Sequence, residues 1–151
     1  MADNFAANPG SGGATFASDD ISSVHYPRIK ISAGRDGTAA DVLTIFRSID
    51  VDETEEEIKS TAGVVYGWFI FNLATATRYI KFYNATAASV TVGTTTPVLT
   101  FPLATGQGAN VSFPHGIDFS TAICIAATTG VSDSDTGAPG ANEIIANIFY
   151  I

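Results

Sequence analysis

Few residues of this chain have the types and the spacing that catalysis needs. His25 stands two residues before Pro27 in an extended stretch, and His115 stands in a Pro-His-Gly turn, so neither has the setting of a Ser-His-Asp set. Cys124 lies in the apolar run Ile-Cys-Ile-Ala, which predicts a packed thiol and not a nucleophile. We therefore expect no catalytic residue and interpret the chain as one that is not an enzyme.

Acidic clusters give weak signals for metal binding or acid–base chemistry. Asp133 and Asp135 could offer oxygens to calcium, but the full calcium-loop signature is absent and a solvated loop is favoured. The three glutamates at 55–57 lie in an acidic run, where consecutive glutamates usually face solvent. The glycines at 10–13 follow no strand and precede no lysine, so they do not form a phosphate loop. The sequence predicts no metal and no cofactor.

Composition excludes several partners. The chain has 151 residues, with seven Lys plus Arg against fifteen Asp plus Glu, and a net charge of −8. Nucleic-acid binders and membrane-surface binders need positive charge, so we expect neither partner. A single cysteine excludes an internal disulfide framework. The longest apolar run, near Val64–Phe71, is far shorter than the roughly 18 residues of a membrane span, and the first residues lack the features of a leader, so we expect a soluble protein made in a cytoplasm.

Charge is distributed unevenly along the chain. Residues 1–60 hold eleven acids and five bases, whereas residues 61–151 hold four acids and two bases. Free domains usually need a charged surface to stay dispersed, so a neutral surface favours a protein packed into an assembly. The alternative is a Thr-rich β domain whose solubility comes from its acidic N-terminal part. We divide the chain into residues 1–60, an extended N-terminal arm, and residues 61–151, a β domain.

The arm has little that could hold it in a fold of its own. Residues 1–23 are rich in Gly, Ala, Ser, Asn and Asp, so we expect them to be flexible and to become ordered on a partner. Val24–Ser32 reads as an extended edge segment because Pro27 lacks an amide donor. Val42–Ile49 could return as a second strand and complete a hairpin. The acidic run 50–59 predicts a short helix or a solvated linker.

Strand signals recur from residue 63. Gly63–Phe71 is apolar on both faces, which indicates a covered central strand, and Gly67 within it suggests a bulge or a close backbone approach. Further strands are predicted, with turn signals between them, at 77–84, 89–92, 97–103, 109–113, 122–128 and 143–151. The pattern predicts an all-β fold, an antiparallel β-sandwich or jelly-roll-like domain of about eight strands.

Aromatic residues gather within residues 66–83. Three interpretations stay open: contact with another subunit, the core of one sandwich, or sugar binding by an exposed Tyr or Trp. For the first interpretation the candidate subunit contacts are Tyr66, Trp68, Tyr79 and Tyr83.

Several motifs resemble those of a known family. The run Ser-Asp-Asp-Ile-Ser-Ser-Val-His-Tyr-Pro-Arg-Ile-Lys at 18–30 leads into the turn Asp-Gly-Thr at 36–38, as in many virion proteins of tailed bacteriophages. The later segments are similar to a β module that the same proteins carry; they are Tyr-Gly-Trp at 66–68 and the stretches 77–84, 96–99, 113–117 and 128–135. Together these motifs cover most of residues 18–150.

The resemblance implies a structural virion protein without enzymatic activity. Small members of the group look like capsid decoration (cement) proteins, commonly homotrimers on the head surface, with the major capsid protein as partner. It implies an arm that lies across capsid subunits, anchored by Val24, His25, Tyr26, Pro27, Arg28 and Lys30. The expected location is the capsid surface of the virion, after synthesis in the host cytoplasm. The alternative is a head-fibre or tail-associated adhesin that binds glycan on the host surface.

Overall fold

The computed structural model describes residues 5–6, 15–16, 18–21, 24–27 and 42–151. The chain forms two compact units, Met1–Ala33 and Gly34–Ile151. Within the first unit, the described residues form two short antiparallel pairs: β1 (Phe5–Ala6) with β2 (Thr15–Phe16), and β3 (Ser18–Ile21) with β4 (Val24–Pro27). The proposed anchoring residues Val24, His25, Tyr26 and Pro27 make up β4, whereas Arg28 and Lys30 lie outside the described residues.

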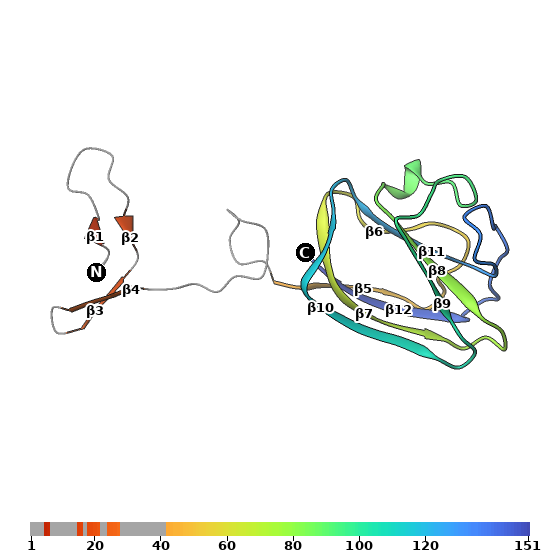
Figure 1. Cartoon of the computed structure of the whole chain (residues 1–151), viewed down its shortest axis with the longest axis horizontal. Helices are drawn as coiled ribbons and strands as arrows, with labels where there is room; N and C mark the ends of the chain where they lie inside the picture. Colours follow the sequence, from red (N-terminus) through yellow and green to blue (C-terminus); the bar gives the residue numbers. More distant parts are fainter. Residues whose placement is uncertain (1–4, 7–14, 17, 22–23, 28–41) are drawn as a thin grey trace. The chain divides into compact units, whose positions relative to one another are not determined.

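The second unit is a β-sandwich of two four-stranded antiparallel sheets, seen as two layers in Figure 1. The first sheet has the order β10-β7-β12-β5, with β10 at Gly108–Phe119, β7 at Gly63–Asn72, β12 at Ile144–Tyr150 and β5 at Thr44–Ser48. The second has the order β6-β11-β8-β9, with β6 at Glu56–Lys59, β11 at Ile123–Thr128, β8 at Arg78–Tyr83 and β9 at Leu99–Leu103. The predicted all-β antiparallel sandwich is confirmed.

The predicted domain boundary at residue 60 is wrong. β5 pairs with β12 and β6 pairs with β11, so residues 44–59 supply an edge strand to each sheet. The run 50–59 is therefore neither a helix nor a solvated linker: Val51 and Ile58 are buried in the core, and the Val51 amide donates to the Ile144 carbonyl at 3.1 Å. The acidic run led to this error because an edge strand can carry acidic side chains while it buries apolar ones.

The main core lies between the two sheets. Alternate residues of β7, such as Trp68 and Ile70, point inward and meet Ile80 and Phe82 of β8. The Trp68 and Phe82 rings stack with their centroids 5.2 Å apart. This burial of aliphatic and aromatic side chains from both sheets is the main force that holds the layers together.

A second, smaller cluster lies on the outer face of the β6-β11-β8-β9 sheet. Tyr83, Val90, Cys124 and Ala126 are buried there. Val90 follows a short 3₁₀ turn, η1 (Ala87–Ser89), so the strand predicted at 89–92 is wrong, and this segment instead covers the sheet. The cover explains why β11 is buried on both of its faces.

Gly67 makes the close backbone approach that its place in β7 predicts. A Cβ atom at this position would collide with the Val111 carbonyl oxygen of the neighbouring strand β10. The ladder between β7 and β12 also shifts its register beside it, between Phe149 and Tyr150. Glycine is therefore required here by contact with backbone, and not by an unusual φ angle.

Candidate functional site

Two of the four predicted subunit contacts are corrected by the structure. Trp68 is only 4% exposed and Tyr83 is fully buried, so neither can touch a second subunit. Trp68 lies among three rings, at centroid distances of 5.2 Å to Phe82, 5.2 Å to Phe101 and 5.0 Å to Phe113. Tyr66 and Tyr79 are half-buried. Trp68 and Tyr83 thus follow the core interpretation that the sequence also left open.

The aromatic side chains that reach solvent are different ones, on the outer face of the first sheet. Phe69 and Phe71 alternate with the buried Trp68 and Ile70 and are 54% and 41% exposed, and Ile45 on β5 is 61% exposed. Half-buried Ile145 and Phe149 of β12 lie between these strands. We define the outer apolar face by its five members, Ile45, Phe69, Phe71, Ile145 and Phe149.

Strand register places the members of the outer apolar face side by side, around Asn147 of β12 and its partner Arg47 of β5. Phe71 lies opposite Ile145, and Phe149 lies opposite Ile45. The Phe69 and Phe149 rings meet edge to face, with centroids 5.2 Å apart. Exposed apolar side chains in one contiguous group mark an interaction site more strongly than scattered ones. Sequence reasoning found the double-sided apolar pattern of β7 but not which side would stay open.

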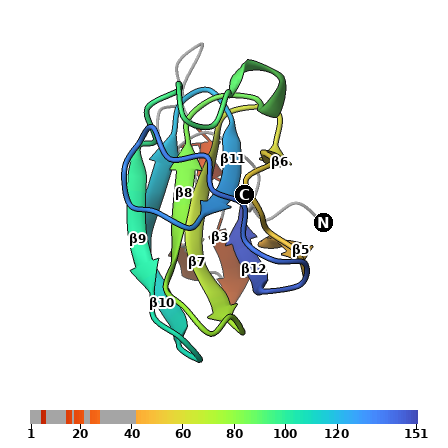
Figure 2. The same ribbon diagram turned by 90° about the vertical axis from the view of Figure 1, so that its right-hand side faces the viewer.

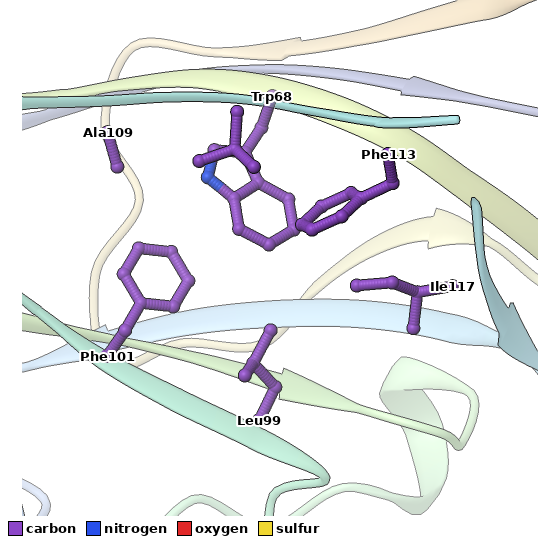
Figure 3. A pocket seen from close by; sticks show the side chains of 7 residues that line it. Trp68, Leu99, Phe101, Ala109, Phe113 and Ile117 are labelled. Atoms are coloured by element: carbon purple, nitrogen blue, oxygen red, sulfur yellow. The ribbon is translucent and has the colours of Figure 1, made fainter. Parts of the chain in front are cut away.

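An apolar groove runs between β9 and β10, on the open side of the sandwich (Figure 3). Its volume is about 370 Å³. All of its lining side chains are apolar, and we define the β9–β10 groove by them: Trp68, Leu99, Phe101, Ala109, Val111, Phe113 and Ile117. The indole N–H of Trp68 is buried beside the groove without a hydrogen-bond partner. A sugar, whose hydroxyls need hydrogen bonds when they leave water, does not fit this lining.

None of the candidate catalytic and metal-binding residues is a member of the outer apolar face or lines the β9–β10 groove. His115 is exposed on β10. The Asp135 carboxylate accepts the Gly130 and Gly137 amides at 2.9 and 3.1 Å, so it organises its own loop. Buried Lys81 fixes the same loop by donating to the Ser132 carbonyl at 2.7 Å. Among the described residues no group of three or more His, Cys, Asp or Glu side chains could hold a metal ion.

Burial and local hydrogen bonds explain the shifted pKa values of the ionisable groups. Burial raises the pKa of the Cys124 thiol to about 12, in agreement with the predicted packed thiol. Burial likewise raises the pKa of Tyr83 to about 12. The pKa of Glu56, in the acidic run, is also raised by burial, although the Ser48 hydroxyl donates to it at 2.9 Å and opposes the shift. None of these groups lies on the outer apolar face or lines the groove.

Comparisons with known proteins match the chain to no family model, no curated protein and no solved structure. Within the described ranges no helix is long and apolar enough to cross a membrane. The structure itself therefore defines a β-sandwich domain with two apolar surfaces: the outer apolar face, among whose members Asn147 and the charged Arg47 also lie, and the β9–β10 groove.

Proposed function

We propose that this chain is a structural protein of a bacteriophage virion, a capsid decoration protein that packs its outer apolar face against neighbouring protein subunits. The observation that carries the proposal is the exposure of Phe69, Phe71 and Ile45 in one contiguous group. The motifs at 18–38 and 66–135, which resemble those of tailed-phage virion proteins, support the assignment to a virion.

Burial of this face would supply much of the binding free energy. Fully burying one phenylalanine side chain is worth about 1.5–3 kcal/mol, and aromatic residues at the centre of an interface usually dominate its affinity. Phe69 and Phe71 sit on β7, an interior strand of a rigid sheet, so little ordering is needed when a partner covers them. Such a surface suits permanent packing in an assembly better than turnover of a substrate.

The strand order supports the proposal by analogy of fold. If the eight sandwich strands, β5 to β12, are renumbered 1 to 8 along the chain, the strand order is 6-3-8-1 in the first sheet and 2-7-4-5 in the second. This order suits a jelly roll, a fold of two sheets that occurs in viral capsid and lectin domains. A fold alone does not define a function, so the proposal depends mainly on the outer apolar face.

The proposed partners are the major capsid protein and further copies of this chain in a homotrimer, on the capsid surface of the virion. Val24–Lys30 would anchor the arm across capsid subunits. A protein that binds only the assembled lattice stabilises it by mass action. Three arms in one trimer would add avidity without new contacts. The mechanism is mechanical: the sandwich would clamp adjacent capsomers together.

The alternative, an adhesin that binds glycan, has one observation in its favour. Asn110 and Asn147 lie opposite Phe69 on the two neighbouring strands, so amide groups flank an exposed ring. An aromatic ring with amides beside it can stack on a sugar and bond its hydroxyls. Screening the protein against a glycan array tests this alternative.

Deletion of residues 1–32 tests the role of the arm. Because the first sandwich strand begins at Thr44, the shortened chain should keep its fold, which circular dichroism and thermal unfolding would check. We expect it to lose binding to expanded phage capsids that lack the protein, measured by co-sedimentation. Unchanged capsid binding would contradict the anchoring role, and binding of a glycan by the shortened chain would favour the adhesin.

A further inference from the structure

The four edge strands of the sandwich are protected unequally against pairing with another chain. β5 carries Arg47, β6 carries two glutamates and Lys59, and β9 carries Pro102. Charged side chains and proline are the usual devices that prevent edge strands from pairing. The Gly108–Phe113 part of β10 has neither. This unprotected stretch is the edge at which the sandwich can accept another strand.

The free side of β10 can be assigned to particular residues. At the end of the β7–β10 ladder the backbone N–H of Asn72 donates to the backbone carbonyl of Gln107 at 2.9 Å. Hydrogen-bonded pairs alternate along an antiparallel ladder, so the backbone groups of Gly108, Asn110 and Ser112 point away from β7. No described strand pairs with that side. Three residues therefore present donors and acceptors in the spacing that an added strand needs.

Charge favours a second copy of this chain as the occupant. Two molecules that each carry a net charge of −8 repel one another wherever their charged surfaces approach. Residues 82–117, which include β9 and most of β10, contain no Asp, Glu, Lys or Arg. The β9 and β10 edges lie together on one side of the sandwich, opposite the charged β5 and β6 edges (Figure 2). A second copy can approach this side without charge repulsion.

We propose that β10 pairs antiparallel with β10 of a second copy, centred on Asn110. Asn110 then faces Asn110 of the second copy, and Gly108 faces Ser112. The contact is two-fold symmetric, so each strand satisfies the free backbone groups of the other. The two first sheets join into one continuous sheet. This inference goes beyond the proposed function and does not rest on it, because it uses an edge and not the outer apolar face.

The β9–β10 groove gains cover from the same pairing. In this register Ala109 lies opposite Val111 of the second copy, and both residues line the groove on the inner side of β10. Val111 is among the exposed large apolar side chains of the free chain. Pairing would place apolar side chains of one copy beside those of the other, so the two grooves continue across the two-fold axis.

A charge-swap experiment at Asn110 tests the pairing and its register. Asn110 is exposed, so Asn110→Asp and Asn110→Lys should both fold. Each variant alone places like charges opposite one another across the axis, whereas a mixture of the two places opposite charges together. The matched controls are Ser60→Asp and Ser60→Lys, which change the net charge by the same amounts. Ser60 is also exposed, and it lies in the connection between β6 and β7, before the first residue of β7, Gly63. It is therefore away from Asn110, which pairs with Phe69 further along β7.

Light scattering at increasing protein concentration gives the readout. In solution, without capsids, we expect the unaltered chain to form a species of twice 15.7 kDa, whereas the proposed homotrimer forms on the capsid surface. Each Asn110 variant should weaken this association at least about tenfold, and the equimolar mixture should restore it. The Ser60 variants should behave as the unaltered chain. A chain that stays monomeric, or a dimer that persists unchanged in both Asn110 variants, would overturn the proposal; a persistent dimer would place the contact on another surface.

Discussion

The ring of Phe69 on β7 meets the ring of Phe149 on β12 edge to face, with centroids 5.2 Å apart and an interplanar angle of 80°. This geometry is a favoured one for aromatic pairs, and here it occurs on the outside of a sheet. The pair fixes two large apolar side chains in a defined orientation before any partner arrives. The outer apolar face is thus a preformed surface and not a chance exposure of flexible residues.

Replacing Phe69 and Phe71 together by serine should remove most of the apolar character of this face. Because both side chains are substantially exposed, we expect the fold to remain and the free energy of unfolding to fall by less than about 2 kcal/mol. Fluorescence of a dye that binds apolar surfaces should decrease. Val131→Ser is the matched control, since Val131 is 61% exposed but lies in a loop. Equal dye binding by the double variant and the control would contradict the prediction.

Asn72 should be the polar side chain whose loss costs the sandwich most. It is fully buried, its amide donates to the Ala76 and Leu103 carbonyls at 2.9 and 2.8 Å, and its oxygen accepts the Ala74 amide at 2.8 Å. Asn72→Ala leaves these backbone groups without partners, so we expect a loss of about 3 kcal/mol in urea unfolding.

A loss below about 1 kcal/mol for Asn72→Ala would contradict this assignment. Thr75→Ala provides the control, because Thr75 follows in the same connection between β7 and β8 and its side chain is exposed. This control should change stability by less than about 0.5 kcal/mol.

The Cys124 thiol should be chemically silent in the folded protein. It is fully buried on β11, and burial raises its pKa to about 12, so almost no thiolate exists at about pH 8. We expect no reaction with a disulfide reagent at this pH until denaturant is added, after which one thiol per chain should react. Rapid, stoichiometric reaction of the native protein would show that the outer cover of this sheet opens readily.

Two glutamates should give the stability opposite dependences on pH. Hydrogen bonds from the Gly140 amide and from Arg78 lower the pKa of Glu143 in the folded state. The ionised Glu143 therefore stabilises the fold at pH values above the pKa of glutamate in the unfolded chain, about 4.3. This stabilisation is lost as the pH falls through the lower pKa that Glu143 has in the folded state. Burial raises the pKa of Glu56, so ionisation of Glu56 destabilises the fold as the pH rises above about 4.3.

Chemical unfolding of Glu143→Gln and Glu56→Gln across this pH range separates the two effects. Glu143→Gln should be less stable than the unaltered chain at neutral pH, and the difference should shrink in acid. Glu56→Gln should be more stable than the unaltered chain at neutral pH, and this difference should also shrink in acid. The same sign of change for both variants at neutral pH would contradict the assignment.

Much of the fold could be predicted from sequence because local patterns dominate in its centre. The strand and turn signals that recur from residue 63 and the glycine of β7 indicated the observed structure. Edge strands were harder, since three of the four residues of β6 are charged and only Ile58 is apolar and buried. The segment at 89–92 has strand-like composition, yet it forms a cover because its Val90 packs onto Tyr83 and Cys124.

The candidate site depended on information that one strand does not contain. Residues 68–71 are apolar on both faces of β7, so the sequence cannot say whether Trp68 or Phe69 faces the core. The choice is made by the second sheet, which offers Phe82 and Phe101 to stack on Trp68. The β9–β10 groove likewise arises only when the free edges of two sheets come together.

Co-sedimentation with expanded phage capsids that lack the protein tests the central claim most directly. The unaltered chain, the Phe69→Ser/Phe71→Ser double variant and the Val131→Ser control would be compared at equal concentrations. If the outer apolar face packs against capsid subunits, the double variant should bind at least about tenfold more weakly while the control binds normally. Equal binding of all three proteins would contradict the claim that this face makes the contact.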